Sequence, residues 1–176
     1  VSKILNSAPN TNLLREPFNP HHRPGVFSEE ISTWFLYLDS ELGARYEQSY
    51  RSMLDFQYGA SAELRSIQSI RDMGRMVRDF SEMYRAARNP SCRPLIKDPL
   101  ALLSTEWIVN NFSAKAVILM RHPAAFVSSL KRVGWKISFN QFLKQPAFMD
   151  RLSPGICNQI RSAASKPPDL IERGAV

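Results

Sequence analysis

The sequence is poor in cysteine, with two among its 176 residues. Cys92 and Cys157 lack the spacing of metal ligands, and although they could pair, two free thiols in a reducing compartment are the better interpretation. No apolar run approaches the roughly 20 residues that cross a bilayer, and the first ten residues lack the basic and apolar segments of a signal peptide. We therefore expect a cytoplasmic protein with no membrane span.

Long runs of one charge are also absent. The net charge of +7 suits an anionic ligand or partner, such as a nucleotide, a sulfated glycan or a membrane surface. The basic residues are dispersed, however, with no run of about five or more and no alternation of aromatic and basic residues that would stack single-stranded bases. A nucleic-acid partner is therefore disfavoured.

What is present is an ordinary globular composition, with 44% hydrophobic and 22% charged residues. The length is enough for one domain, and we interpret residues 1–176 as a single domain. Val1–Ser7 has the pattern of the end of a helix with no start signal, and the last residues begin what looks like another helix. We expect the natural chain to continue beyond both ends.

Residues 28–88 form a predicted helical segment. Ser28 has the position of an N-cap for a first helix that buries Ile31, Trp34, Phe35, Leu38 and Leu42. A second helix is predicted over residues 60–88, where apolar residues recur at steps of three and four. The other face of this second helix carries Arg65, Arg71, Arg75, Arg78 and Arg85, which predicts a solvated basic face or, as the weaker alternative, a surface for an acidic acceptor.

The rest of the chain alternates between strand and helix patterns. Short apolar segments predict strands at Asn12–Arg15 and Arg93–Lys97, and a helix can start at Pro99. Ala116–Met120 is a continuous apolar run, which is typical of a parallel strand buried on both faces, and a further helix follows Pro123. This order predicts an α/β fold with a central parallel sheet flanked by helices.

Three polar side chains come at the ends of these predicted strands, namely Glu16, Lys97 and Arg121. In open parallel sheets, ligands bind beyond the carboxyl ends of the strands. The Arg121 guanidinium could hold a phosphate, and Ser129, eight residues later, could add a hydroxyl to the same anion. An ion pair for Arg121 and a helix contact for Ser129 are the structural alternatives.

The segment RPLIKDPLALLSTEWIVNNFSAKAVILMRHPAAFVSSLKRVGW resembles the middle of the sulfotransferases that use 3′-phosphoadenosine 5′-phosphosulfate (PAPS). That family has a Lys-Asp-Pro after one strand, and a strand that ends in an Arg followed by a Ser eight residues later. The resemblance implies a P-loop NTPase-like architecture, PAPS as the sulfuryl donor and no metal. It also implies that Arg121 and Ser129 bind the 3′-phosphate of the nucleotide, with Ser128 the less favoured serine.

The opening VSKILNSAPNTNLLREPFNP is similar to the stretch that follows the phosphosulfate-binding loop of that family. In the tyrosylprotein members a Glu seven residues after a Pro is the catalytic base, and Glu16 stands at that separation from Pro9. The resemblance also places Lys97 near the transferred group. His21 and His22 are rival bases, although their position in the proline-rich loop 17–24 favours a surface or acceptor-side role.

The chain departs from the family in one respect, because no Gly-rich, Thr-Thr phosphate loop occurs in it. We therefore expect either a truncated chain or a degenerate, non-catalytic nucleotide-binding or interaction protein. A P-loop kinase-like phosphotransferase is a further alternative, but it would need Mg²⁺ ligands and a Walker Lys. The acceptor hydroxyl could belong to a small molecule, a glycan, a lipid or a peptide, and residues 28–88 are expected to lie on the acceptor side.

Overall fold

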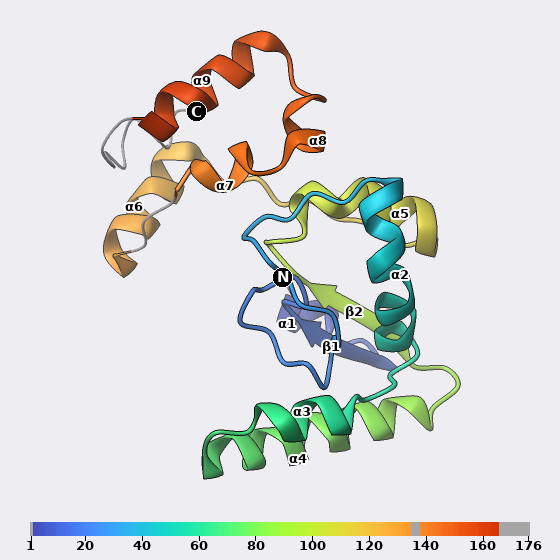
Figure 1. Ribbon diagram of the computed structural model, residues 1–176. Coiled ribbons are helices and arrows are strands. Elements are labelled where there is room, and N and C mark those ends of the chain that lie inside the picture. The colour runs from blue at the N-terminus through green and yellow to red at the C-terminus, as the bar shows by residue number, and fades with distance from the viewer. Residues whose placement is uncertain (1, 135–137, 166–176) are drawn as a thin grey trace. The chain divides into compact units, whose positions relative to one another are not determined.

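The computed structural model describes residues 2–134 and 138–165, and it is a mixed α/β structure with a small parallel sheet and several helices (Figure 1). The chain divides into two compact units, residues 1–114 and 115–176. We describe each unit by itself. Within the described ranges, no helix has the length and apolar character to cross a membrane.

The first unit contains both strands. Its elements, in chain order, are α1 (Ser2–Leu5), β1 (Thr11–Arg15), α2 (Ser40–Leu54), α3 (Ala60–Ser66), α4 (Ile70–Ala87), β2 (Arg93–Lys97), a 3₁₀ turn (Leu102–Ser104) and α5 (Thr105–Phe112). Two of the three strands predicted from the sequence, Asn12–Arg15 and Arg93–Lys97, are thus confirmed, as is the loop that follows the first of them.

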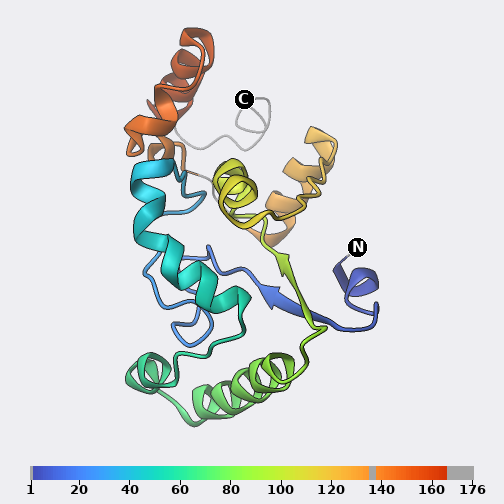
Figure 2. The same ribbon diagram turned by 90° about the vertical axis from the view of Figure 1, so that its right-hand side faces the viewer.

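The sheet is formed by β1 and β2, which run parallel and pair residue for residue from Thr11 opposite Arg93 to Arg15 opposite Lys97. Figure 1 shows the two arrows side by side and pointing the same way, and Figure 2 shows the same strands from another side. The ladder continues past β1, because the Glu16 amide donates to the Lys97 carbonyl at 3.0 Å. The carboxyl ends of both strands therefore meet at one edge of the sheet, as expected for two parallel strands.

An aromatic core supports this edge. Phe18, Phe27 and Tyr50 are each 0–1% exposed, and the Tyr50 ring contacts Phe112 with ring centroids 4.5 Å apart. The helices α2 and α5 pack against each other. Trp107 of α5 lies so close to Gly43 that a Cβ at position 43 would collide with the indole ring. Burial of such large rings is the main favourable contribution to stability in this unit.

The predicted helix at Ser28 is wrong. Residues 28–39 are irregular, and α2 begins only after Asp39, whose carboxylate accepts from the Leu42 amide at 2.8 Å. The Ser28 hydroxyl instead contacts the Ser49 hydroxyl at 2.6 Å. Ile31 is still buried, because an irregular segment can turn apolar side chains inward without a helical period.

The single helix predicted over residues 60–88 is interrupted. Ile67 adopts an extended conformation at the end of α3, and Ser69 caps α4, accepting from the Asp72 amide at 3.2 Å. The Ser69 hydroxyl also donates to Asp72 Oδ2 at 2.7 Å. The Gln68 amide donates to the same Asp72 oxygen at 3.3 Å, and these bonds form a variant of the capping box, which fixes a new helix start.

The face that α4 buries also differs from the expectation. Met83 and Ala86 are buried, whereas Ile70 is 87% and Val77 66% exposed. The predicted basic face is solvated: all five of its arginines are exposed, and two of them pair with neighbouring aspartates of α4.

The second unit is helical where it is described. It contains α6 (Pro123–Val133), α7 (Asn140–Leu143), α8 (Pro146–Met149) and α9 (Pro154–Ser165). A small core gathers Phe139, Met149, Cys157, Ile160 and Ala163. The helix predicted after Pro123 is confirmed, while the helix expected at the end of the chain falls outside the described residues.

The strand predicted at Ala116–Met120 is not formed. These residues have no regular structure and pair with no strand in the described part of the chain, and Val117 and Met120 are 75% and 92% exposed. A strand exists only through its inter-strand hydrogen bonds, so an apolar run without a pairing partner does not become one. The cysteines match the expectation, since Cys92 and Cys157 are both free thiols.

Candidate functional site

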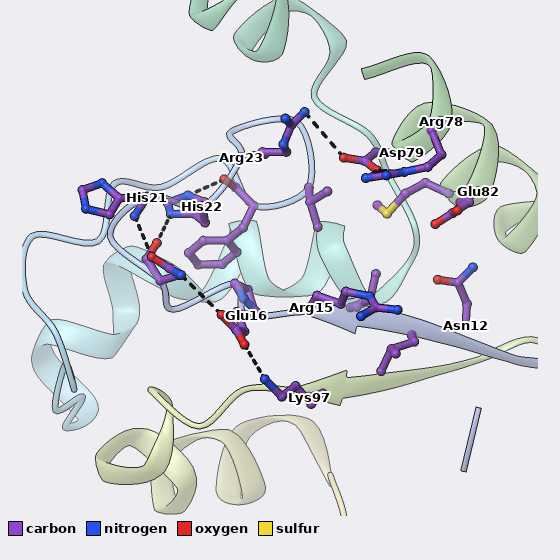
Figure 3. Close-up of a pocket in the computed structure, with 17 residues that line it drawn as sticks. Asn12, Arg15, Glu16, His21, His22, Arg23, Arg78, Asp79, Glu82 and Lys97 are labelled. Atoms are coloured by element: carbon purple, nitrogen blue, oxygen red, sulfur yellow. Dashed lines mark hydrogen bonds and ion pairs between the residues drawn. The ribbon is translucent and has the colours of Figure 1, made fainter. Parts of the chain in front are cut away.

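The carboxyl ends of the two strands bring Glu16 and Lys97 together. The Lys97 ammonium donates to Oε1 of Glu16, so the two side chains form an ion pair across the edge of the sheet (Figure 3). Glu16 has a positive φ of 49°, a left-handed conformation that turns the chain out of the sheet immediately after β1. Glu16 and Lys97, both predicted at strand ends, thus meet at one edge of the sheet, and their ion pair was not predicted from the sequence.

The surroundings of Glu16 favour its charged form. Its pKa is lowered from the usual value, first by the hydrogen bond from Lys97 and then, against the opposing effect of burial, by the Lys97 charge. A weaker hydrogen bond from Asn19 Nδ2, at 3.3 Å from Oε2, acts in the same direction. Glu16 is therefore a carboxylate at neutral pH and is able to accept a proton.

The ion pair lies at the edge of a pocket of about 660 Å³. The pocket walls come from β1, the loop of residues 16–27, the end of β2 and α4. Figure 3 shows that the polar lining comprises both signs of charge, with Arg15, Arg23, Arg78 and Lys97 as cations and Glu16, Asp79 and Glu82 as anions. Arg15 forms no ion pair within the described residues, so its guanidinium is available to a ligand.

His22, one of the rival bases, is occupied by the backbone. Its two ring nitrogens lie 2.8 Å from the Asn19 carbonyl oxygen and 2.9 Å from the Phe27 carbonyl oxygen. Carbonyl oxygens only accept hydrogen bonds, so both ring nitrogens face backbone acceptors. Neither nitrogen is left free to meet an acceptor hydroxyl, and this geometry argues against His22 as the base.

The other rival, His21, is turned toward an aromatic ring. Its imidazole packs edge-on against Trp34 with ring centroids 5.8 Å apart. His21 is exposed and also lines the pocket. This position suits contact with a bound molecule, and the described residues leave Glu16 as the better placed base.

A buried ion pair fixes the loop that forms one side of the pocket. Arg23 donates to Glu63 Oε1 at 3.0 Å, and the Gly25 amide donates to Glu63 Oε2 at 2.9 Å. Arg23 also lies 3.7 Å from Asp79 of α4. Glu63 is only 2% exposed, and a buried carboxylate of this kind is tolerated because both of its oxygens have donors.

Glu16 and Lys97 were predicted from the sequence, and Arg78 only as part of a basic helix face, whereas the other charged groups of the pocket were missed. Arg15 could have been recognised, because it directly precedes Glu16 at the end of a predicted strand. The position of Arg78 and Glu82 at the pocket could not, because the pattern of α4 gives no sign of which helix face turns toward the strands.

The two residues predicted to bind the 3′-phosphate belong to the second unit. Arg121 is exposed in the irregular segment before α6, and Ser129 is half-buried within α6, next to the exposed Ser128. Arg121 forms no ion pair within residues 2–134 and 138–165, so its guanidinium remains free for an anion. The described residues contain no cluster of three or more His, Cys, Asp or Glu side chains that could hold a metal ion.

No protein-family model, curated protein or solved structure matches this chain. The function of the protein is therefore inferred from its own residues.

Proposed function

We propose that the protein is a sulfotransferase that moves a sulfuryl group from PAPS to an acceptor hydroxyl. The observation that carries this proposal is the ion pair of Glu16 and Lys97 at the carboxyl ends of two adjacent parallel strands, on the edge of a polar pocket. Ligands of parallel sheets bind at this edge. The resemblance of the sequence around Lys97 and Arg121 to the PAPS-dependent enzymes supports the same assignment.

Glu16 would act as the general base. Its carboxylate is ionised and partly exposed at the pocket, so it can receive the proton that the acceptor hydroxyl loses as its oxygen bonds to sulfur. A carboxylate with a lowered pKa is a weak base, and it suits a proton transfer that occurs while the new bond forms and the hydroxyl becomes acidic.

Lys97 would have two functions in this scheme. Its ammonium holds the Glu16 carboxylate in place, and it presents positive charge to the negative charge that develops on the bridging oxygen of the departing nucleotide. When PAPS is bound, it supplies the sulfuryl group and leaves as 3′,5′-adenosine bisphosphate. No metal ligand is needed for this chemistry.

Arg121 and Ser129 would bind the 3′-phosphate. An exposed guanidinium and a serine hydroxyl are both donors, and their chemistry fits a phosphate. They would position the donor rather than take part in proton transfer.

The transfer step is tested by substitution of the base. Glu16→Gln is expected to lower sulfuryl transfer by about 10²- to 10⁴-fold, because a positioned base contributes this much. Affinity for 3′,5′-adenosine bisphosphate is expected to stay within a few-fold. The measurement follows ³⁵S from labelled PAPS into a panel of saccharide, phenol and peptide acceptors. Glu47→Gln, which removes an exposed carboxylate of α2, is the matched control, and unchanged transfer by Glu16→Gln would remove Glu16 from the mechanism.

A further inference from the structure

Asp98 links the two segments that leave the carboxyl ends of the strands. Its Oδ2 accepts from the Phe18 amide at 2.7 Å, and its Oδ1 accepts from the Leu100 amide at 2.8 Å. Phe18 follows β1 at a separation of 80 residues in the chain from Asp98, whereas Leu100 begins the turn after β2. One carboxylate thus ties the segment that carries Glu16 to the segment that carries Lys97.

The bond between Asp98 and the Phe18 amide restrains the backbone on the C-terminal side of Glu16. On its other side, the Glu16 amide donates to the Lys97 carbonyl at 3.0 Å. The Phe18 ring is fully buried, so the chain cannot shift freely beyond Pro17. Glu16 adopts its left-handed conformation between these two fixed points, and such a conformation persists only where the surrounding structure holds it.

We propose that Asp98 is a positioning residue that holds the Glu16 carboxylate opposite Lys97. The significance of this role for catalysis rests on the proposed function, but the geometric role itself does not. Asp98 is not expected to contact substrate, because both of its oxygens are already engaged by backbone amides.

A positioning role of Asp98 can be distinguished from a purely electrostatic one, because the two predict opposite changes in the pKa of Glu16. Two carboxylates repel each other, so loss of the Asp98 charge alone would lower the pKa of Glu16. Loss of the Asp98 bonds would instead release Glu16 from Lys97, whose hydrogen bond is the main cause of the low pKa, and the pKa of Glu16 would rise.

Asp98→Asn tests this difference. The asparagine has the same shape, but its single carbonyl oxygen can accept only one of the two amides, and its NH₂ group faces the other donor. We expect the pKa of Glu16, followed by NMR of its carboxyl carbon, to rise, as for a carboxylate that loses a close cation. An unchanged or lowered pKa would overturn the proposal.

Asp39→Asn is the matched control. It also replaces a carboxylate that accepts from a backbone amide, that of Leu42, but it does so at the start of α2, away from the strand ends and outside the pocket lining. We expect no change in the pKa of Glu16 in this variant. An equal rise in both variants would show a general loosening of the unit and would count against Asp98.

A second measurement needs no variant and decides the matter if Asp98→Asn does not fold. In the unaltered protein, the amide proton shifts of Phe18 and Leu100 should titrate together with the Asp98 carboxyl. Their common midpoint should lie above the usual aspartate value, because burial raises the pKa of Asp98. Separate midpoints, or no titration of the Phe18 amide, would show that the link is absent.

These readouts distinguish failure of this inference from failure of the proposed function. A rise in the pKa of Glu16 in Asp98→Asn, combined with no sulfuryl transfer by the unaltered protein, would leave the positioning role intact and reject the enzyme assignment. Transfer by the unaltered protein, combined with an unchanged pKa in Asp98→Asn, would do the reverse.

Discussion

Two segments were predicted to be strands from the same kind of pattern, residues 93–97 in the first unit and residues 116–120 in the second. Only residues 93–97 form a strand, which is β2. β2 has the sequence RPLIK and is largely exposed or half-buried, whereas AVILM is wholly apolar. β2 forms because each of its residues has a partner on β1. The comparison teaches that the pairing partner, and not apolar character, decides whether a segment becomes a strand.

The same contrast separates the two groups of residues predicted from the sequence to have a function. Glu16 and Lys97 are joined by paired strands, and an aromatic core supports them. Arg121 follows a segment without such support, and its proposed role is based on the sequence pattern.

The largest effect is expected from the core. Phe18→Ala should lower the free energy of unfolding by about 3–5 kcal/mol, because it removes a fully buried ring. Met120→Ala should change it by less than about 0.5 kcal/mol, because this side chain is 92% exposed. Denaturant unfolding measures both, and a large effect of Met120→Ala would show that the run 116–120 is packed after all.

Hydrogen exchange should show the contrast along the backbone. Amides of β1 and β2 that donate within the ladder should exchange at least about 100-fold more slowly than in a free peptide, whereas amides of residues 117–120 should exchange at nearly the free rate. Mass spectrometry of peptides from the native protein is the measurement. Strong protection of residues 117–120 would indicate that they pair with a strand.

A smaller effect is expected at the ion pair. Lys97→Met should raise the pKa of Glu16, because it removes the main cause of the lowered value. Lys144→Met, at an exposed position of the second unit, should leave that pKa unchanged and is the control. NMR titration of the Glu16 carboxyl measures both, and a constant pKa in Lys97→Met would contradict the pair.

The lowered pKa of Glu16 also makes the stability of the folded protein depend on pH. The pKa of Glu16 is lower in the folded protein than the usual value of 4.5, so the unfolded chain binds the proton more readily. The pair therefore contributes stability above about pH 4.5, and this contribution is lost as the pH falls through the folded pKa. The contribution is at most about 1 kcal/mol, since both side chains are partly exposed.

The sequence was sufficient for the features that depend on local signals and on one long-range pairing. The strands around Leu14 and Ile96, the helix after Pro123 and the meeting of Glu16 with Lys97 were all predictable. The start of α2 was missed because the apolar residues after Ser28 match a helical period while the chain stays irregular. The capping box at Ser69 was a visible signal that would have divided the helix 60–88.

Other features could not be read from sequence, because they depend on tertiary contacts. The face that α4 buries is set by what Met83 and Ala86 pack against. Residues 116–120 form no strand because they pair with no other strand in the described part of the chain. The two amides that bind Asp98 were also unforeseen, since one of them lies 80 residues away in the chain.

The most direct test of the sulfotransferase assignment is calorimetric binding of 3′,5′-adenosine bisphosphate compared with 5′-AMP. We predict a preference for the bisphosphate that Arg121→Ala lowers by about 10- to 100-fold, as expected for the loss of a charge-assisted hydrogen bond. Arg132→Ala, which removes an exposed arginine from the last turn of α6, should leave the preference intact. Equal affinity for the two nucleotides, or a preference that survives in Arg121→Ala, would contradict the account.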